Sequence, residues 1–176
     1  MTAFEPRQFR DACGQFGTGV TVIAAHFENG DHGMTANAFM SVSLEPPLIA
    51  VSIAERARLL PKLLAARRFT VSVLTENMED VAWHFAGKYK TSLTNLFEQY
   101  DDLPVVKGAA ASFIADLEQH VAAGDHRICI GRVRSIRSRP GARPLLFLHG
   151  EFTRASHGQA HIAPPALLEG VDDFLW

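Results

Sequence analysis

Residues 33–53 carry the side chains in this sequence that are best suited to holding a flat ligand. Small polar residues interrupt an otherwise apolar, strand-forming stretch; they are Thr35, Asn37, Ser41 and Ser43. Small side chains let a planar ring lie against the backbone, while hydroxyl, amide and main-chain groups orient a mostly apolar ligand. The alternative is an ordinary turn between strands, in which Asn37 bonds its own backbone and Pro46-Pro47 closes a loop.

A second candidate segment, Ser52 to Arg58, directly precedes a predicted helix. The unpaired N–H groups and the positive end of a helix attract an anion such as a phosphate. Arg56 and Arg58 can add charge-assisted hydrogen bonds to that anion. The alternative is that both arginines form a solvated surface.

A third candidate is His126, which follows the tight turn Gly124-Asp125 at the start of a predicted strand. From this position an imidazole can project into a cleft and stack on, or bond to, a planar ring. The alternative is a partly exposed histidine with no ligand. Asp125 itself is interpreted as a turn residue.

Many predicted strands and a few short helices must position these residues. Hydrophobic spacing predicts a helix over 6–15, a second beginning close to Leu60 because Pro61 belongs in a first turn, and a third capped by Asn77 and ended by Gly87. Strands are predicted over 20–27, around Met34, and over 48–53, 69–74, 112–122, 126–137, 145–148 and 151–153, with 88–107 irregular. Because most connections are hairpins, an antiparallel barrel is favoured over a parallel sheet.

Composition fits one domain. The chain has 176 residues, 47% of them hydrophobic, and a formal charge of −2, so the overall charge does not call for nucleic acid or an anionic membrane. Residues 1–155 are expected to form the body and 156–176 a tail that packs on the body or on a partner subunit. Cys13 and Cys129 are too few for a disulfide framework, which suits the cytoplasm. No signal peptide or spanning segment is apparent.

Competing motifs are weak. Gly17-Thr-Gly19 lacks the third glycine and the following helix of a Rossmann fingerprint, and there is no phosphate loop. The eight histidines show no close metal-ligand spacing, so no metal is expected. Five arginines between 132 and 143 are interpreted as a solvated strand face, a docking surface or a contact for dinucleotide phosphates. They lack the interleaved aromatic residues of a nucleic-acid reader.

Residues 33–48 resemble the signature of the short-chain flavin reductases, the NAD(P)H-dependent partners of two-component flavin monooxygenases. The segments 16–22, 124–126 and 131–133 match in the same order, so the resemblance covers roughly residues 8–155. It implies a mainly β fold with short helices, the flavin-binding split β-barrel, a Greek-key-like antiparallel barrel that is usually a homodimer.

The resemblance also implies the roles of individual residues. It assigns orientation of the nicotinamide to His126. It assigns flavin binding to Thr35, Ala36, Asn37, Ala38, Ser41, Ser52, Ile53, Ala54, Arg56, Ala57, Arg58 and Lys88. Residues 16–18 and 150–152 match family segments that border the pocket without one fixed residue type.

The implied activity is reduction of FMN or FAD by NADH or NADPH, followed by release of the reduced flavin to a separate monooxygenase. Hydride passes directly between the two cofactors, so no catalytic dyad is required. Main-chain N–H groups in residues 35–38 can stabilise the charge of the reduced ring. Two alternatives are a non-catalytic flavin- or haem-binding split-barrel protein and a dimeric interaction module built around the tail. The sequence does not distinguish FAD from FMN or NADH from NADPH.

Overall fold

The computed structural model describes residues 4–28 and 30–155, and the predicted tail at 156–176 lies outside them. The helices in the described residues are α1 (Pro6–Cys13), α2 (Leu59–Ala66) and α3 (Glu79–Phe85). The strands are β1 (Thr18–Gly19), β2 (Thr21–Phe27), β3 (Gly30–Ala36), β4 (Phe39–Ser43), β5 (Leu48–Ala54), β6 (Arg68–Val73), β7 (Phe97–Tyr100), β8 (Leu103–Val106), β9 (Ala111–Ala123), β10 (His126–Ser138), β11 (Leu146–Leu148) and β12 (Glu151–Thr153).

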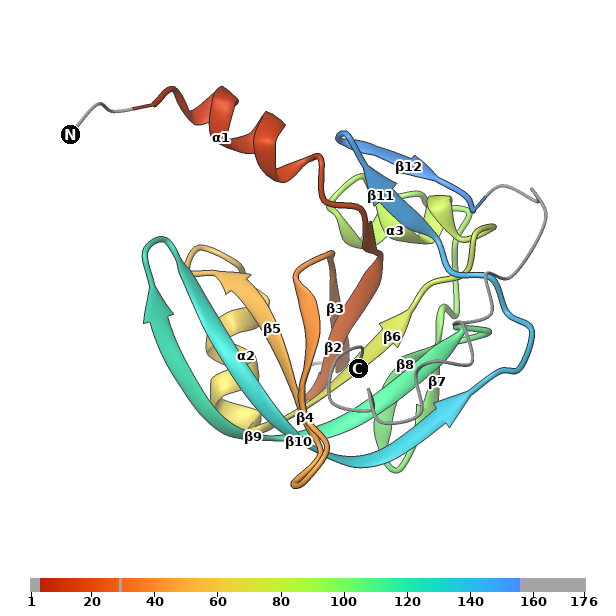
Figure 1. The fold of residues 1–176 in the computed structure, drawn as a ribbon. Helices are drawn as coiled ribbons and strands as arrows, with labels where there is room; N and C mark the ends of the chain where they lie inside the picture. The colour runs from red at the N-terminus through yellow and green to blue at the C-terminus, as the bar shows by residue number, and fades with distance from the viewer. Residues whose placement is uncertain (1–3, 29, 156–176) are drawn as a thin grey trace, which may run out of the picture.

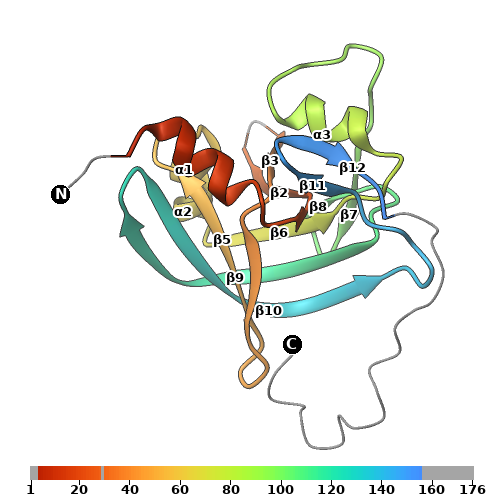
Figure 2. The same ribbon diagram turned by 45° about the horizontal axis from the view of Figure 1, so that its top comes forward.

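Seven strands form one antiparallel sheet in the order β3-β2-β6-β9-β10-β5-β4. The two outer strands, β3 and β4, are consecutive in the chain and are joined by Asn37 and Ala38 alone. The sheet must therefore curl until its edges approach each other at this link, as Figures 1 and 2 show. The predicted antiparallel split barrel is confirmed.

The long hairpin of β9 and β10 provides much of the curvature. Its register shifts between Ile130 and Gly131 and again between Val133 and Ser135. Such bulges bend a strand and increase its twist. Gly131 leaves space for the ring of Phe69 from β6, because a Cβ built at Gly131 would lie 2.6 Å from Phe69 Cζ.

Two hydrophobic clusters fill the fold. The first contains the buried leucines of α2, together with residues of β2, β5, β6, β9 and β10. Alternate residues of β5 point into it, with Ile49, Val51 and Ile53 all at most 4% exposed. The second cluster lies under α3 and β11 and contains Val20 and Leu145. Helices α2 and α3 therefore each pack an apolar face against the sheet.

Helix α1 begins with Pro6 in its first turn, as predicted, but ends at Cys13 rather than near residue 15. None of its residues is buried, and Phe9 is 57% exposed. In Figure 1 the helix extends away from the barrel. The apolar stripe predicted on this helix therefore meets no core within the described part of the chain.

Two other predictions about local structure were wrong. Asn77 does not cap α3, because Met78 occupies that position and the Asn77 side chain accepts a hydrogen bond of 2.6 Å from the Thr75 hydroxyl. The predicted irregular segment 88–107 contains the β7–β8 hairpin. Its turn residues, Asp101 and Asp102, both have positive φ, a conformation that sequence reading associates mainly with Asn-Gly or Asp-Gly.

Within the described residues, no helix has the length and apolar character needed to cross a membrane.

Replacing Gly131 with Ala is expected to destabilise the fold. The added methyl would lie within 2.9 Å of Phe69 and Ala115 atoms in a packed core, and overpacking of this kind costs about 1–3 kcal/mol. Gly19→Ala is the matched control, because a Cβ there meets no atom within 4 Å. Chemical denaturation of both variants measures the difference. Equal stability of the two would contradict the packing described here.

Candidate functional site

The link between the two sheet edges is held from both sides. The Thr21 hydroxyl of β2 donates a 2.7 Å hydrogen bond to the carbonyl of Ala36. The main-chain N–H of Ser52 in β5 donates to the carbonyl of Ala38 at 3.0 Å. Within the described residues, the N–H groups of Asn37 and Ala38 donate to no protein acceptor. The link is therefore fixed in place while its own donors stay available to a ligand.

A cavity of about 400 Å³ lies on one side of this link. Its walls are mainly apolar and come from the end of α1, β1, the link, β4, β5 and β10; they include Cys13, Phe16, Thr18, Asn37, Ala38, Phe39, Met40, Ala50, Val51, Ser52 and Ile128. The side chains of Thr18, Asn37 and Ser52 make no hydrogen bond within the described residues. Apolar walls with a few converging, unpartnered polar groups are typical of a site for a planar organic ligand.

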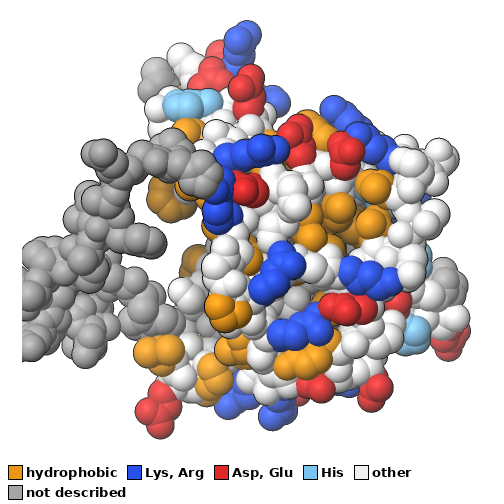
Figure 3. All heavy atoms as spheres, turned by 90° about the vertical axis from the view of Figure 1, so that its right-hand side faces the viewer, with side chains coloured by type: hydrophobic (Ala, Val, Ile, Leu, Met, Phe, Trp, Pro, Cys, Tyr) orange, Lys and Arg blue, Asp and Glu red, His pale blue; other side chains and the backbone are white. Residues whose placement is uncertain are grey.

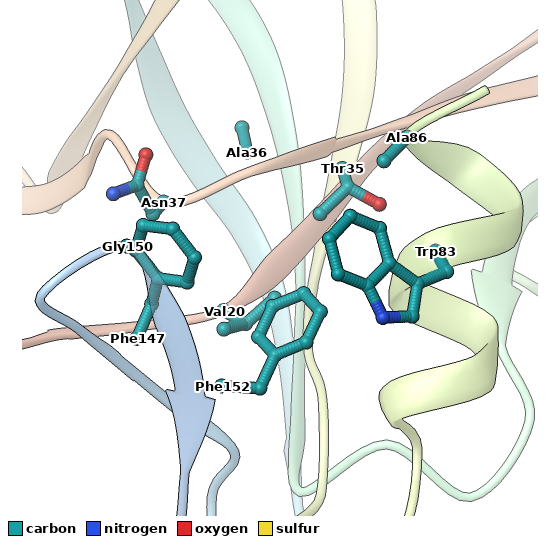
Figure 4. A pocket seen from close by; sticks show the side chains of 9 residues that line it. All are labelled: Val20, Thr35, Ala36, Asn37, Trp83, Ala86, Phe147, Gly150 and Phe152. Carbon is teal, nitrogen blue, oxygen red and sulfur yellow. The ribbon is translucent and has the colours of Figure 1, made fainter. Parts of the chain in front are cut away.

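A second cavity, of about 220 Å³, shares Asn37 with the first. Figure 4 shows the rings of Trp83, Phe147 and Phe152 directed into it, from α3, β11 and β12. Thr35 and Ala36 of β3 line the same space. The Thr35 hydroxyl donates to the carbonyl of Ala82 at 2.6 Å, so it ties β3 to α3 and is not free for a ligand.

Several contacts fix the orientation of Trp83. Its ring meets Phe152 edge to face at 5.0 Å, and its indole N–H donates to Glu79 at 3.3 Å. The ammonium of Lys88 lies 3.7 Å from the ring centroid. Lys88, a predicted flavin-binding residue, is thus placed beside the aromatic cavity without lining it. Such contacts hold an aromatic wall rigid at low entropic cost.

Sequence reading missed Trp83 and Phe147 as site residues. Trp83 lies in a helix whose apolar spacing is also what core packing requires, and Phe147 lies in a strand predicted only as part of the sheet. The weaker candidate segment 150–152 does contribute Gly150 and Phe152 to the cavity. The sequence signal that could have indicated Trp83 is its position next to His84 and shortly before Lys88, and that pattern is not specific for a binding site.

The pairing of β5 with β10 places His126 on the same face of the sheet as Ile128, which lines the larger cavity. His126 pairs with Ala54, and Ile128 pairs with Ser52. Because side chains alternate along a strand, His126 and Ile128 share one face and stand roughly 7 Å apart. The N–H of Glu55 also donates to the carbonyl of Asp125 at 2.9 Å. Two predicted segments that are far apart in the sequence are thus joined directly.

The His126 imidazole pairs with Asp125. Their Nδ1 and Oδ1 atoms lie 2.7 Å apart, and the imidazole is 44% exposed. The hydrogen bond and the charge of His126 hold the pKa of the Asp125 carboxyl below its ordinary value. The stabilisation that comes from the ionised Asp125 carboxyl is therefore lost as pH falls through its lowered pKa. Occupation of Nδ1 leaves Nε2 as the ring nitrogen available to a ligand.

Arg58 is the residue immediately before α2, and Arg56 precedes it by two positions, as predicted. Both are exposed. Ala57 supports the turn between them, because its N–H donates to Ala54 at 2.8 Å and its carbonyl accepts from Leu60 at 3.1 Å. This geometry places two cations at the positive end of a helix, beside the strand end that carries Ala54.

Of the thirteen predicted site residues, five line one of the two cavities: Thr35, Ala36, Asn37, Ala38 and Ser52. The other eight line neither, and among them Ser41 and Ile53 lie in the strands beside the larger cavity. Ser41 pairs with the core residue Ile49, so alternation directs it to the sheet face opposite Met40. Ile53 is fully buried in the core. It can offer a ligand only its main chain. The side chains of Ser41 and Ile53 therefore lie on the sheet face opposite Ser52, which lines the larger cavity.

The five arginines between 132 and 143 do not form a free basic stripe. Arg132 pairs with Glu118 at 2.8 Å and Arg134 with Asp116 at 2.6 Å. Arg137 and Arg143 pair with Glu98 and Glu76, and Arg139 donates to the carbonyl of Gly108. Figure 3 shows basic and acidic side chains side by side on one face of the protein. The interpretation as a charge-compensated solvated face is the one that these contacts support.

No group of three or more His, Cys, Asp or Glu side chains within residues 4–28 and 30–155 is arranged to hold a metal ion.

Comparison with known proteins identifies the family to which this chain belongs. Residues 13–156 match the model of the flavin reductase like domain. The reductase component of 4-hydroxyphenylacetate 3-monooxygenase from Thermus thermophilus is 42% identical over 146 residues, covering 83% of this chain and 94% of its own.

Solved structures agree. The flavin reductase PheA2 in its native state superposes with a TM-score of 0.84 at 40% identity, covering 87% of this chain and 99% of its own. The NADH:FAD oxidoreductase SgcE6 of Streptomyces globisporus, in complex with NAD and FAD fragments, gives a TM-score of 0.81 at 31% identity, covering 91% of this chain and 100% of its own. The chain belongs to the flavin reductase family.

Proposed function

We propose that this protein uses NADH or NADPH to reduce FMN or FAD and supplies the reduced flavin to a separate monooxygenase component. The observation that carries the proposal is the cavity at the Asn37–Ala38 link, where apolar walls surround three polar side chains that make no hydrogen bond to the described residues. The names of the relatives support it, since they describe flavin reductases and the reductase component of a monooxygenase.

The flavin ring would lie flat against residues 35–38. The free N–H groups of Asn37 and Ala38 are donors for the polar edge of the ring, where negative charge develops on reduction. The side chains of Asn37 and Ser52 supply further hydrogen bonds from the cavity wall. The phosphate tail would lie along Ser52 to Arg58, where Ala54, Ala57 and the two arginines precede α2.

The nicotinamide would be oriented by His126. Its Nδ1 is held by Asp125, and its side chain lies on the sheet face that carries Ser52 and Ile128. The cofactors supply the hydride transfer. The protein brings their rings together, a positioning effect that contributes several kcal/mol to catalysis. Lys88, at the rim of the aromatic cavity, is the remaining cation near the bound rings.

A homodimer is part of the proposal. Helix α1 buries none of its residues. Phe16, between α1 and β1, is 78% exposed and lines the same cavity as Met40 of β4, which is 59% exposed. Leu44, beyond β4, is 66% exposed. Exposed apolar side chains of this size call for a partner, and a second copy would both cover them and close the cavity.

We also propose a domain boundary and a location. The family match at residues 13–156 supports a body ending near residue 155 and a separate tail. Cys13 and Cys129 are both free thiols, which supports a reducing cytoplasm.

The purified protein is expected to oxidise NADH or NADPH when FMN or FAD is present. His126→Ala should raise KM for the nicotinamide roughly tenfold, because one orienting contact is lost, and leave the flavin Kd unchanged. Nicotinamide absorbance and flavin fluorescence measure the two effects. Flavin binding without turnover in the wild type would instead favour the non-catalytic carrier.

Ser52→Ala should weaken flavin binding roughly three- to tenfold, because Ser52 lines the cavity and its hydroxyl has no protein partner. Ser41→Ala is the matched control, since Ser41 lies in the neighbouring strand on the opposite face. Its flavin Kd should equal that of the wild type. Equal losses in the two variants, measured by flavin titration, would place the ring elsewhere.

The wild type is expected to sediment as a dimer. Phe9→Glu, on the uncovered face of α1, should shift the equilibrium toward monomer because it places a charge in the apolar contact. Tyr89→Glu is the control, as Tyr89 is 76% exposed outside this surface. Analytical ultracentrifugation distinguishes the states. A monomeric wild type would rule out the proposed assembly.

A further inference from the structure

One buried hydroxyl in the larger cavity has no hydrogen-bond partner. Among the buried side-chain nitrogen and oxygen atoms of the described residues, Thr18 Oγ1 alone lacks one. A buried hydroxyl normally finds a partner, because removing it from water without one costs free energy. An orphaned group of this kind calls for an explanation in terms of a ligand or of strain.

Thr18 also occupies a special place between the two cavities. It lines the larger cavity together with Asn37, the residue that the two cavities share. In the β1–β11 ladder it pairs directly with Phe147, a wall of the aromatic cavity. Figure 4 shows Phe147 and Asn37 close together on the same side of that cavity. A planar ring lying against the link would therefore pass next to Thr18.

We propose that Thr18 is a flavin-binding and specificity-determining residue whose hydroxyl forms a hydrogen bond with a polar atom of the ring. This inference rests on the proposed function. A hydroxyl both donates and accepts, so it can pair with a ring nitrogen or oxygen of either polarity. In the ligand-free protein the oxygen is shielded from solvent, so a rotation about Cα–Cβ or a movement of a neighbouring side chain must expose it.

The neighbours allow such a movement. Phe16 and Met40, which line the same cavity, are 78% and 59% exposed. Core packing within one chain therefore does not fix them, and in the proposed dimer, which covers them, rotation of Thr18 about Cα–Cβ is the movement that exposes the oxygen. A hydrogen bond from the ring would satisfy the Thr18 hydroxyl, which favours binding of a ligand with a polar atom at this position over an apolar ring of the same shape.

Thr18→Val tests the proposal with two measurements: protein stability, which should not fall, and flavin affinity, which should. Valine has almost the same shape but no hydroxyl. The melting temperature of the flavin-free protein should stay equal or rise, because an unsatisfied group is removed, whereas flavin Kd from fluorescence titration should increase roughly three- to tenfold. Thr18→Ser keeps the hydroxyl and should bind flavin nearly as the wild type does.

Thr70→Val is the control for an ordinary buried threonine. The Thr70 hydroxyl donates to the carbonyl of Pro104 at 2.6 Å, so its loss should lower the melting temperature. A Thr18→Val variant that binds flavin like the wild type, or whose melting temperature falls as in Thr70→Val, overturns this inference alone. A wild type that binds neither FMN nor FAD overturns the proposed function, and this inference with it.

Discussion

The meeting of two sheet edges at Asn37 and Ala38 is the constraint on which the site depends. Strands β3 and β4 are the outermost strands of a seven-stranded sheet, yet only two residues separate them in the chain. The sheet has to curl to satisfy both conditions. At the junction no strand among the described residues takes up the N–H groups of the link, while the Ser52 and Thr21 bonds keep it in place. Rigid, unpaired donors are what a ring-binding edge requires.

The antiparallel ladder then assembles the remaining parts around this edge. The register of β5 with β10 sets His126 opposite Ala54 and Ser52 opposite Ile128, so the predicted phosphate segment and the predicted nicotinamide contact become neighbours. The short β1–β11 ladder likewise sets Thr18 beside Phe147. Each pairing is made by main-chain hydrogen bonds, so the geometry of the site depends on strand register. Burial of one face of a sheet specifies that register strongly.

Much of this was predictable from sequence, for identifiable reasons. The antiparallel pairing of consecutive strands, the helix start near Pro61 and the paired long strands all follow from turn chemistry and periodicity. The family resemblance implied flavin binding for Ser41 and Ile53 together with Asn37 and Ser52, because it does not say which side chains of a strand line a cavity. Nor could periodicity separate a core aromatic from a cavity wall, so Trp83 and Phe147 were missed. The β7–β8 hairpin escaped because its turn uses two aspartates at positive φ.

The central claim is that the flavin ring lies flat against residues 35–38. A crystal structure of the protein grown with excess FMN or FAD tests it most directly. The expected result is ring density along this link, with Thr18, Asn37 and Ser52 within hydrogen-bond distance of its polar atoms and the phosphate ahead of α2. Density elsewhere, or a cavity filled by the protein's own side chains while flavin is bound at another place, would contradict the claim.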